Sequence, residues 1–533
     1  MVIRAFISSL LEELDEIDFE TLFRNLLRSF GHNAIFERTR HGQGEHGKDI
    51  ISLSRNNAAE TVHVFQLKVR EINTSRFRNE VKPELDAMIQ VPITHSLVKG
   101  SEPLTYVLVS TGDFTPDASV EFDAYNKHNI KKGDPEIKLW NKSKLIDFFF
   151  SDLSSLSILI PSFQEEVARI WLNQKSKKYL REDWLKIVDK TLSSSQKHKK
   201  PLLVLGIAAS FLATQARLQE EYLTAFDIYR IALVGIWATL YENEDEKIAI
   251  FDNLHNEYCM LIERFANEKK SVFSKKNGLH KGDNGVVETI LYPIRTFSVL
   301  GALSYLAYFY GNTGNAEKES VVVVDSIEEI IKSNPSVLTP TTDWLRKDIA
   351  IAIVELCRNR RSFLAEKWIV KMLSNLNRRY IRSGWYPSKS IVPDEIIEDM
   401  FHFKQQKAQL PTSSLIPLLF QFCWKLNLSG VYEKYSKVFY DFRLLEFVPP
   451  EDTTLAEAEL FKGNLAHGTE IERKYPHSFK DYRNQVNKLT FKPYSPLKKN
   501  RPCVLQMITD VHQHHVFPEI YLNFQIVADK TDC

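Results

Sequence analysis

The hydrophobic pattern of this chain changes once, near Pro161, and that change constrains the fold more than any other feature. Before it, short apolar runs of strand length alternate with stretches that have helical spacing. After it, strand-like runs nearly vanish and long amphipathic stretches replace them. Because a single core stops growing near ~250–300 residues, a chain of 533 residues should form at least two domains. We therefore predict an α/β domain followed by a large all-α region.

The first part of the chain predicts elements in the order α-β-β-α-β-α-β-α, which is typical of a sheet with helices on its faces. The first helix has an apolar stripe over 19–30 that Gly31 closes. Strands follow at 49–54 and 62–69, with 55–60 as their turn. The later elements are a helix over 75–90 with Pro83 near an end or a break, a strand over 105–111, a helix over 116–129, a strand over 136–140 and a helix over 143–150.

The all-α region shows three stretches that each read as two apolar helices joined by a polar turn: 202–241, 298–335 and 348–376. The second loosely resembles a tetratricopeptide unit, but no fixed period of ~34 residues emerges. A tetratricopeptide-like array with degenerate repeats and an irregular helical bundle both stay open. We place the domains at 1–157, 158–500 and 501–533, the last with short strands at 503–508 and 520–528.

Bulk composition excludes several classes of protein. A formal net charge of +1 argues against binding nucleic acid by overall charge, so any such contact needs a local basic surface. No run approaches the roughly 18 apolar residues of a membrane span, so we expect no membrane association. The cysteines are odd in number, far apart and without a C-x-x-C pair, which favours reduced thiols in a cytoplasmic protein. They are Cys259, Cys357, Cys423, Cys503 and Cys533.

The residues from Gly42 to Arg70 carry the clearest chemical pattern. Asp49 follows a glycine-rich approach at the start of one predicted strand, and Gln66 and Lys68 alternate with apolar residues on the next. Residues two apart on a strand share a face, so the amide and the ammonium project together. If the two strands pair, the carboxylate of Asp49 reaches the same face. Taken singly each residue would be read as a solvated position; taken together they indicate a site.

Such a set suits phosphodiester cleavage. Mg²⁺ takes oxygen ligands and keeps several waters, so one or two protein oxygens can hold it. The metal polarises a phosphate and acidifies a bound water, and a lysine offsets charge on the phosphoryl oxygens. Glu20 on the first helix supplies a second carboxylate if that helix packs beside the strand ends; a solvated helix position is the alternative. We predict Mg²⁺ as cofactor, with Mn²⁺ as a substitute.

With these motifs, the first ~155 residues resemble an Mrr-type nuclease of the restriction-endonuclease-like superfamily. Five motif blocks occur in the family's order, and together they are more specific than any one. The matching residues are Phe19, Glu20, Leu26 and Leu27; Gly44, Gly47 and Asp49; Gln66 and Lys68; Val109, Ser110, Thr111, Phe114, Thr115 and Ala118; and Ile137, Leu139 and Leu145. The departure is that His46 and Lys48 interrupt the glycine-rich lead.

The resemblance implies metal-dependent DNA cleavage, with Asp49 and Gln66 as metal ligands and Lys68 as the catalytic lysine. We add Glu20 to the catalytic and metal-binding sets. We predict nucleic-acid contacts at Lys48, Arg76, Arg78 and Thr111, although a solvated charged helix face equally explains the two arginines. The cluster of Asp510, His512, His514 and His515 has metal-binding donors, but we interpret it as a polar surface turn.

The resulting hypothesis is a DNA endonuclease that serves as the effector of a prokaryotic defence system and is regulated by its helical region. That region would bind a protein partner or form a homo-oligomer. The alternatives are a catalytically weak nucleic-acid-binding scaffold and an RNase. The complete set of Asp49, Gln66 and Lys68 favours the enzyme, because a purely binding domain has no physical need for it. No Walker motif is present, so a nucleotide-driven step would need another subunit.

Overall fold

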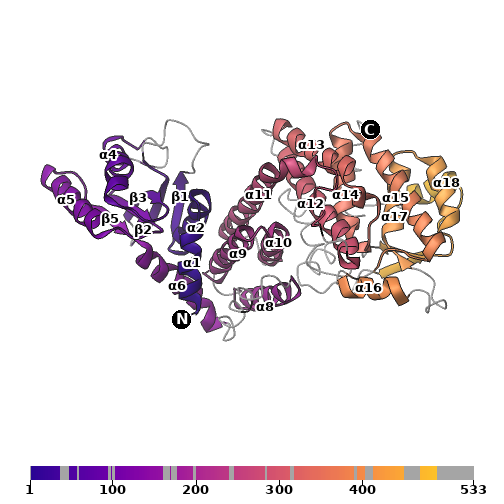
Figure 1. Ribbon diagram of the computed structural model, residues 1–533, viewed down its shortest axis with the longest axis horizontal. Helices are drawn as coiled ribbons and strands as arrows, with labels where there is room; N and C mark the ends of the chain where they lie inside the picture. Colours follow the sequence, from indigo (N-terminus) through magenta and orange to yellow (C-terminus); the bar gives the residue numbers. More distant parts are fainter. Residues whose placement is uncertain are drawn as a thin grey trace. The chain divides into compact units, whose positions relative to one another are not determined.

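The computed structural model describes residues 2–36, 47–56, 59–93, 98, 102–159, 169, 177–195, 200–238, 245–282, 285–312, 317–388, 390, 393–402, 412–448 and 469–488. The chain divides into two compact units, Met1–Leu254 and His255–Cys533, which we call unit 1 and unit 2 and describe separately (Figure 1). The segment 501–533, with its predicted strands and histidine cluster, lies outside the described residues. The predicted domain boundary at residue 157 stays a prediction.

Unit 1 begins with an α/β domain whose described part contains a five-stranded sheet in the order β1-β2-β3-β4-β5 (Figure 1). The strands are β1 (His32–Phe36), β2 (Ile50–Asn56), β3 (Ala59–Lys68), β4 (Leu104–Ser110) and β5 (Ile137–Trp140). The first three pair antiparallel, whereas β3, β4 and β5 are parallel. The parallel pairs need crossover helices, and the predicted helices supply them.

Helices cover both faces of this sheet. On one face, Val62 and Val64 of β3 pack in a core with α4 (Lys82–Gln90) and α5 (Pro116–Lys132). On the other face, the ring of Phe65 lies 5.2 Å from that of Phe23, on α2 (Glu16–Ser29). Alternation along β3 thus sends successive side chains to different helices. Gln66 and Lys68 are an even number of residues from Val62 and Val64, so their side chains lie on the same face of β3, the face covered by α4.

The predicted elements of the α/β domain are confirmed, and two more are present. These are α1 (Val2–Glu13) and β1, neither of which was expected from the sequence. β1 has five residues, which is too short to show a clear period. α6 (Lys142–Leu159) closes the domain.

Pro83 lies where the sequence analysis predicted a break. The segment starts with α3 (Thr74–Arg76), passes through a π-helical turn, η1 (Phe77–Val81), and continues as α4. Pro83 is the second residue of α4. Proline lacks an N–H to donate, and it is placed just after the π-helical turn, where the α-helical hydrogen-bond ladder is already interrupted. The π-helical turn, a rare element that often marks functional sites, directly precedes the helix facing β3.

The helices after the α/β domain share its core. Unit 1 continues with α8 (Lys177–Ser195), α9 (Lys200–Leu218) and α10 (Tyr222–Ala238). α9 packs on α2, where Asn25 Nδ2 donates to Ser210 Oγ at 2.8 Å and Arg217 pairs with Asp18. It also meets α6, where the rings of Phe149 and Phe211 lie 4.8 Å apart. The first helices of the helical region are therefore packed onto the α/β domain.

Unit 2 contains two of the three predicted helix pairs. α12 (Val286–Asn312) precedes α13 (Glu317–Ser333), and α14 (Arg346–Arg358) precedes α15 (Ser362–Ser383). Its other helices are α16 (Pro393–His402), α17 (Leu415–Lys425), α18 (Ser429–Val438) and α20 (Phe479–Lys488), while α11 (Asp245–Phe273) crosses the division between the units. A small sheet of β6 (Thr412–Ser413), β7 (Arg443–Val448) and β8 (Thr469–Arg473) interrupts this otherwise helical region, which the sequence analysis did not anticipate.

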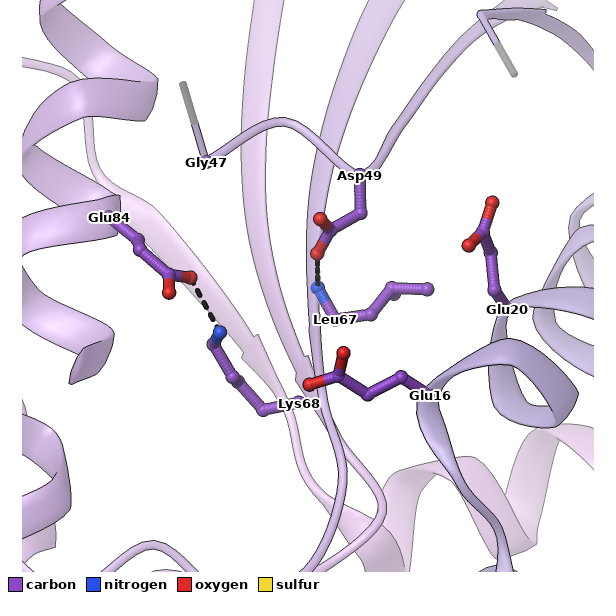
Figure 2. A pocket seen from close by; sticks show the side chains of 7 residues that line it. All are labelled: Glu16, Glu20, Gly47, Asp49, Leu67, Lys68 and Glu84. Atoms are coloured by element: carbon purple, nitrogen blue, oxygen red, sulfur yellow. Dashed lines mark hydrogen bonds and ion pairs between the residues drawn. The ribbon is translucent and has the colours of Figure 1, made fainter. Parts of the chain in front are cut away.

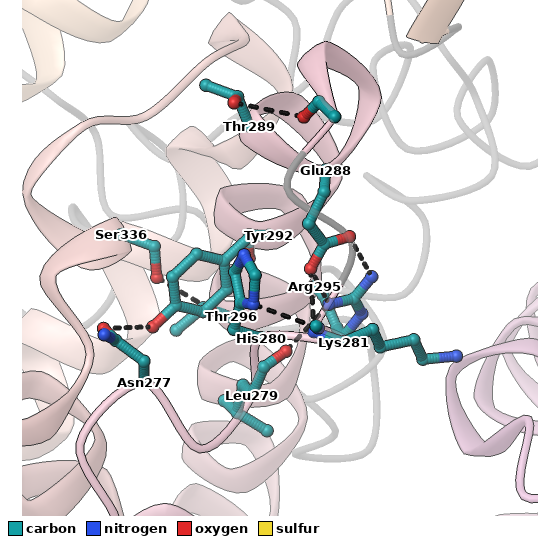
Figure 3. A network of polar contacts seen from close by, with 12 residues as sticks. Asn277, Leu279, His280, Lys281, Glu288, Thr289, Tyr292, Arg295, Thr296 and Ser336 are labelled. Atoms are coloured by element: carbon teal, nitrogen blue, oxygen red, sulfur yellow. Dashed lines mark hydrogen bonds and ion pairs between the residues drawn. The ribbon is translucent and has the colours of Figure 1, made fainter.

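A polar network fixes the loop between α11 and α12 (Figure 3). Arg295 on α12 forms a bidentate pair with Glu288 at 2.9 and 3.0 Å and donates to the carbonyl of Leu279 at 2.7 Å. The hydroxyl of Tyr292 donates to Asn277 and Asn334. These partners satisfy one another, so the network holds the loop in place.

Within the part of the chain that the structure describes, two helices, α9 and α12, are long and apolar enough to cross a membrane by length and composition. Their apolar windows, Pro201–Leu218 and Val287–Gly311, are 89% and 72% buried inside the protein. Burial of this extent is what the core helices of a helical domain show.

Candidate active site

A pocket of about 300 Å³ in unit 1 is lined by residues of α2, β3, α4 and the segment that leads into β2 (Figure 2). Figure 2 shows Asp49 and Lys68 in the middle, Glu84 of α4 on one side, and two carboxylates of α2 on the other. The lining residues are Glu16, Glu20, Gly47, Asp49, Leu67, Lys68 and Glu84. Three of the predicted residues, Glu20, Asp49 and Lys68, therefore line one pocket.

Asp49 is held at the start of β2 by two hydrogen bonds to β3. Its backbone N–H donates to the carbonyl of Phe65 at 3.0 Å, and its carboxylate accepts from the N–H of Leu67 at 2.6 Å. It lies one position beyond the Ile50–Phe65 pair, opposite Gln66. The hairpin predicted from the sequence thus brings the carboxylate to the Gln66–Lys68 end of β3.

Lys68 and Gln66 meet the same carboxylate of α4. Lys68 Nζ lies 2.5 Å from Glu84 Oε2, and the side-chain nitrogen of Gln66 donates to the same oxygen. Gln66 is completely buried and is not among the residues that line the pocket. Its amide oxygen is also buried and accepts no hydrogen bond from the described residues. The structure therefore places Gln66 behind Glu84, next to the pocket.

The carboxylates of α2 approach from the opposite side. Glu20 is 4% exposed, and its Oε1 accepts from Arg24 Nη2 at 2.6 Å. Glu16, one turn earlier, is exposed and also lines the pocket. The sequence predicted a role for Glu20 only if its helix packs beside the strand ends. That helix is α2, and it does so.

The four residues predicted to contact nucleic acid lie in different environments. Lys48 is 5% exposed, and burial lowers its pKa. Thr111 is 1% exposed, and its hydroxyl accepts from the N–H of Arg70 at 3.0 Å. Arg76 Nη1 donates to the carbonyl of Val69 at 2.6 Å. Arg78, by contrast, is exposed and forms a bidentate pair with Glu121, whose hydrogen bonds and charge raise the arginine pKa. Arg78 alone of these four has an exposed side chain, and all four roles stay predictions.

Sequence reasoning missed two carboxylates, Glu16 and Glu84. Glu16 precedes Glu20 by four residues and so shares its helix face, a signal that the sequence does contain. Glu84 has no comparable signal. Its position depends on how the segment from Thr74 to Gln90 folds back over β3, which no local spacing reveals.

The donor set of the pocket fits a hydrated divalent cation. All donors are oxygens: the carboxylates of Glu16, Glu20, Asp49 and Glu84, with the unpaired amide oxygen of Gln66 beside them. Within the described residues, no three His, Cys, Asp or Glu side chains are close enough to hold a metal together. A hard cation such as Mg²⁺ keeps several waters and needs only one or two protein oxygens, so this arrangement suits it.

Comparison with known protein families agrees with the fold, which is that of a domain of the restriction-endonuclease-like superfamily. Residues 11–149 match the Mrr catalytic family model, described as restriction endonuclease. The first part of this chain is therefore an Mrr-type restriction-endonuclease domain, and such a domain implies DNA as the substrate. The match ends within α6 and does not include α8–α10 or unit 2. No curated protein and no solved structure matches the chain.

Proposed function

We propose that this protein is a metal-dependent DNA endonuclease that uses Mg²⁺, with Mn²⁺ as a substitute. The observation that carries the proposal is that Asp49 and Lys68 line one pocket, together with carboxylates from two helices. A divalent cation bound there supplies Lewis-acid polarisation of the scissile phosphate and a more acidic bound water. Asp49, with Glu20 from α2 and the amide oxygen of Gln66, would hold it.

The chain's own groups have distinct tasks in this proposal. Lys68 is 8% exposed, so its ammonium acts in a poorly solvated position, where it offsets charge developing on a phosphoryl oxygen more effectively than in water. Strand β3 fixes the side of the sheet from which it projects. The N–H of Leu67 fixes the carboxylate of Asp49 at the end of β3, where it lines the pocket.

The test is cleavage of plasmid, linear DNA, single-stranded DNA and RNA by the full chain with Mg²⁺, Mn²⁺ or EDTA. Asp49→Asn keeps an acceptor for the N–H of Leu67 but removes the charge, and Lys68→Met keeps most of the side-chain length. We expect both variants to fold and to lose cleavage by at least about a hundredfold, as removal of one electrostatic catalytic group does. Asp117→Asn and Lys82→Met, at exposed positions of the same domain, are the matched controls.

The outcomes separate the candidate functions. Cleavage at wild-type level by folded Asp49→Asn and Lys68→Met would refute the assignment. Binding of DNA without cleavage under all metal conditions would favour the alternative of a nucleic-acid-binding scaffold. Cleavage of RNA but not DNA would identify an RNase.

We also propose that the protein is a cytoplasmic effector of a prokaryotic defence system whose helical region receives a trigger or a partner. Cys259, Cys357 and Cys423 are thiols and not disulfides, which supports a reducing compartment. The size of the helical region supports regulation, because a hundredfold change in activity needs only ~2.7 kcal/mol of coupling. On this proposal the full chain alone is weakly active, and lysate from infected cells raises its activity.

A further inference from the structure

The carboxylate of Glu84 contacts two members of the predicted catalytic set, Lys68 and Gln66. One of its oxygens meets both the ammonium of Lys68, at 2.5 Å, and the side-chain nitrogen of Gln66. Glu84 also lines the pocket, and 42% of its side chain is exposed, compared with 10% for Lys68. It is therefore a carboxylate that reaches both the buried residues of β3 and the open space of the pocket (Figure 2).

Gln66 leaves the site short of negative charge. The amide at position 66 is neutral, and the single charges of Asp49 and Lys68 cancel. Without further groups, β2 and β3 offer a divalent cation no net attraction. The amide nitrogen of Gln66 is committed to Glu84, while its oxygen is fully buried and accepts no hydrogen bond from the described residues. A buried acceptor without a donor is costly, and a cation beside it would remove that cost.

The fold fixes the position of Glu84 by two independent features. Gly47, in the glycine-rich lead to Asp49, has φ +73 and packs on the backbone of Glu84, where an added Cβ would meet the Glu84 carbonyl oxygen at 2.2 Å. The π-helical turn η1 and Pro83 immediately precede Glu84 and set where the first turn of α4 begins. The segment that carries Asp49 is thus packed directly against the residue that carries the carboxylate.

We propose that Glu84 is a metal-binding carboxylate of this site and supplies the negative charge that position 66 lacks. The inference rests on the proposed function, since it needs a divalent cation in the pocket. With Glu84, the set on β2, β3 and α4 carries one net negative charge before the carboxylates of α2 are added. In the metal-free protein the same carboxylate holds Lys68 and Gln66 in place.

The test measures metal binding directly, without DNA. Uptake of Mn²⁺ by the full chain is followed by the loss of the free-ion signal in electron paramagnetic resonance, with Mg²⁺ as competitor. We expect Glu84→Gln to weaken Mn²⁺ binding by about tenfold or more, the size of effect typical for groups of a metal site. The double variant Gln66→Glu with Glu84→Gln should restore most of the affinity, because it returns a carboxylate to the neighbouring position.

The matched control is Glu80→Gln. Glu80 lies one turn before Glu84, pairs with Arg76 at 3.0 Å and is 58% exposed, so its loss should leave Mn²⁺ binding unchanged. Gln66→Glu by itself should bind Mn²⁺ at least as tightly as the wild type, and it is the reference against which the double variant is compared.

Three results would overturn the inference. If Glu84→Gln binds Mn²⁺ like the wild type while Asp49→Asn does not, Glu84 is no ligand and the proposed function stands. If Glu84→Gln loses cleavage with Mn²⁺ affinity intact, Glu84 only positions Lys68. If neither the wild type nor any variant takes up Mn²⁺, the inference and the metal dependence of the proposed function fail together.

Discussion

At the scale of single residues, the hydrogen bonds of two carboxylates, those of Asp49 and Glu84, define the candidate site. Asp49 accepts from the backbone of β3, whereas Glu84 accepts from the side chains of β3. The two carboxylates therefore approach the same strand end from different elements. Exchanging charged for neutral groups of the same shape is the most direct way to separate their roles.

Position 66 gives the first prediction. Gln66→Glu should retain cleavage, because a carboxylate is a stronger ligand for a hard cation than an amide oxygen. Gln66→Leu should lose it, since leucine keeps the volume but has neither an oxygen ligand nor a donor to Glu84. Plasmid cleavage by both folded variants is the measurement. Equal activity in Gln66→Glu, Gln66→Leu and the wild type would show that position 66 takes no part.

Gly47 gives the second prediction. A Cβ at this position would meet the carbonyl oxygen of Glu84 at 2.2 Å, and its φ of +73 disfavours any side chain. Gly47→Ala should therefore displace the lead to Asp49 from α4, with a cost of roughly 1–3 kcal/mol, and weaken Mn²⁺ binding. Gly31→Ala is the control, because Gly31 has a similar φ of +80 but nothing within 4 Å of an added Cβ. Equal metal affinity in the two variants would contradict this explanation.

His32 and His63 give a prediction about pH. Their rings lie 4.6 Å apart. Burial, with the charge of His63 as a second cause, lowers the pKa of His32 from 6.5 to about 4, and burial lowers that of His63. Depressed folded pKa values stabilise the folded state above the unfolded pKa, so this stability is lost as the pH falls from 6.5 towards 4. The hydrogen-exchange protection factors of amides in β2 and β3, that is the intrinsic exchange rate at each pH divided by the observed rate, should fall across that window, and less so in His32→Gln. The exposed His128→Gln is the control.

At the scale of elements, short polar networks fix the connections between apolar helices. Arg295 binds Glu288 and the carbonyl of Leu279, and so ties the loop after α11 to α12. Side-chain exposures of 14% for Arg295 and 7% for Glu288 mark this pair as mostly buried. Losing one partner would leave the other charge largely desolvated.

We expect Arg295→Ala to destabilise unit 2 by roughly 3 kcal/mol. Burial would raise the pKa of Glu288, but the bonds from Arg295 and from the N–H of Lys281 outweigh it and lower that pKa. This stability is therefore present above the ordinary pKa of 4.5 and lost as the pH falls below it. Urea unfolding at pH 7 and pH 4 measures both effects. Arg264→Ala, whose pair with Glu268 is more exposed, should cost under about 0.5 kcal/mol.

At the scale of the whole molecule, unit 1 extends past the α/β domain. α9 covers α2 and α6 through Phe211, Ser210 and Arg217. α2 also carries Glu16 and Glu20, so the helix that lines the pocket is the helix on which α9 packs. A trigger that displaced α9 would act on the carboxylates of the site through α2.

The prediction at this scale concerns fragments. Residues 1–238, which end with α10, should fold and stay monodisperse, whereas residues 1–157 should aggregate or unfold at lower temperature because they expose the face that α9 covers. Thermal unfolding and light scattering of the two fragments test this. Equal stability would show that α8–α10 are not part of the folding unit.

The sequence by itself determined what depends on local spacing. Alternation along 62–69 predicted β3 and the shared face of Gln66 and Lys68; helical stripes predicted α2 and the helix pairs; the motif blocks predicted the family that the comparison confirms for residues 11–149. These features depend on residues only a few positions apart, where a pattern is visible in the chain itself.

Only the tertiary structure decided what depends on distant segments meeting. Nothing in the sequence places Glu84 between Gln66 and Lys68, because that contact requires the segment 74–90 to cross back over β3 after a π-helical turn. Nor does it show that α9 completes the core under α2, since both helices have apolar stripes that any helix could cover. Side chains close in space but far apart in the chain leave no local period, and their chemistry appears only once the core has formed around them.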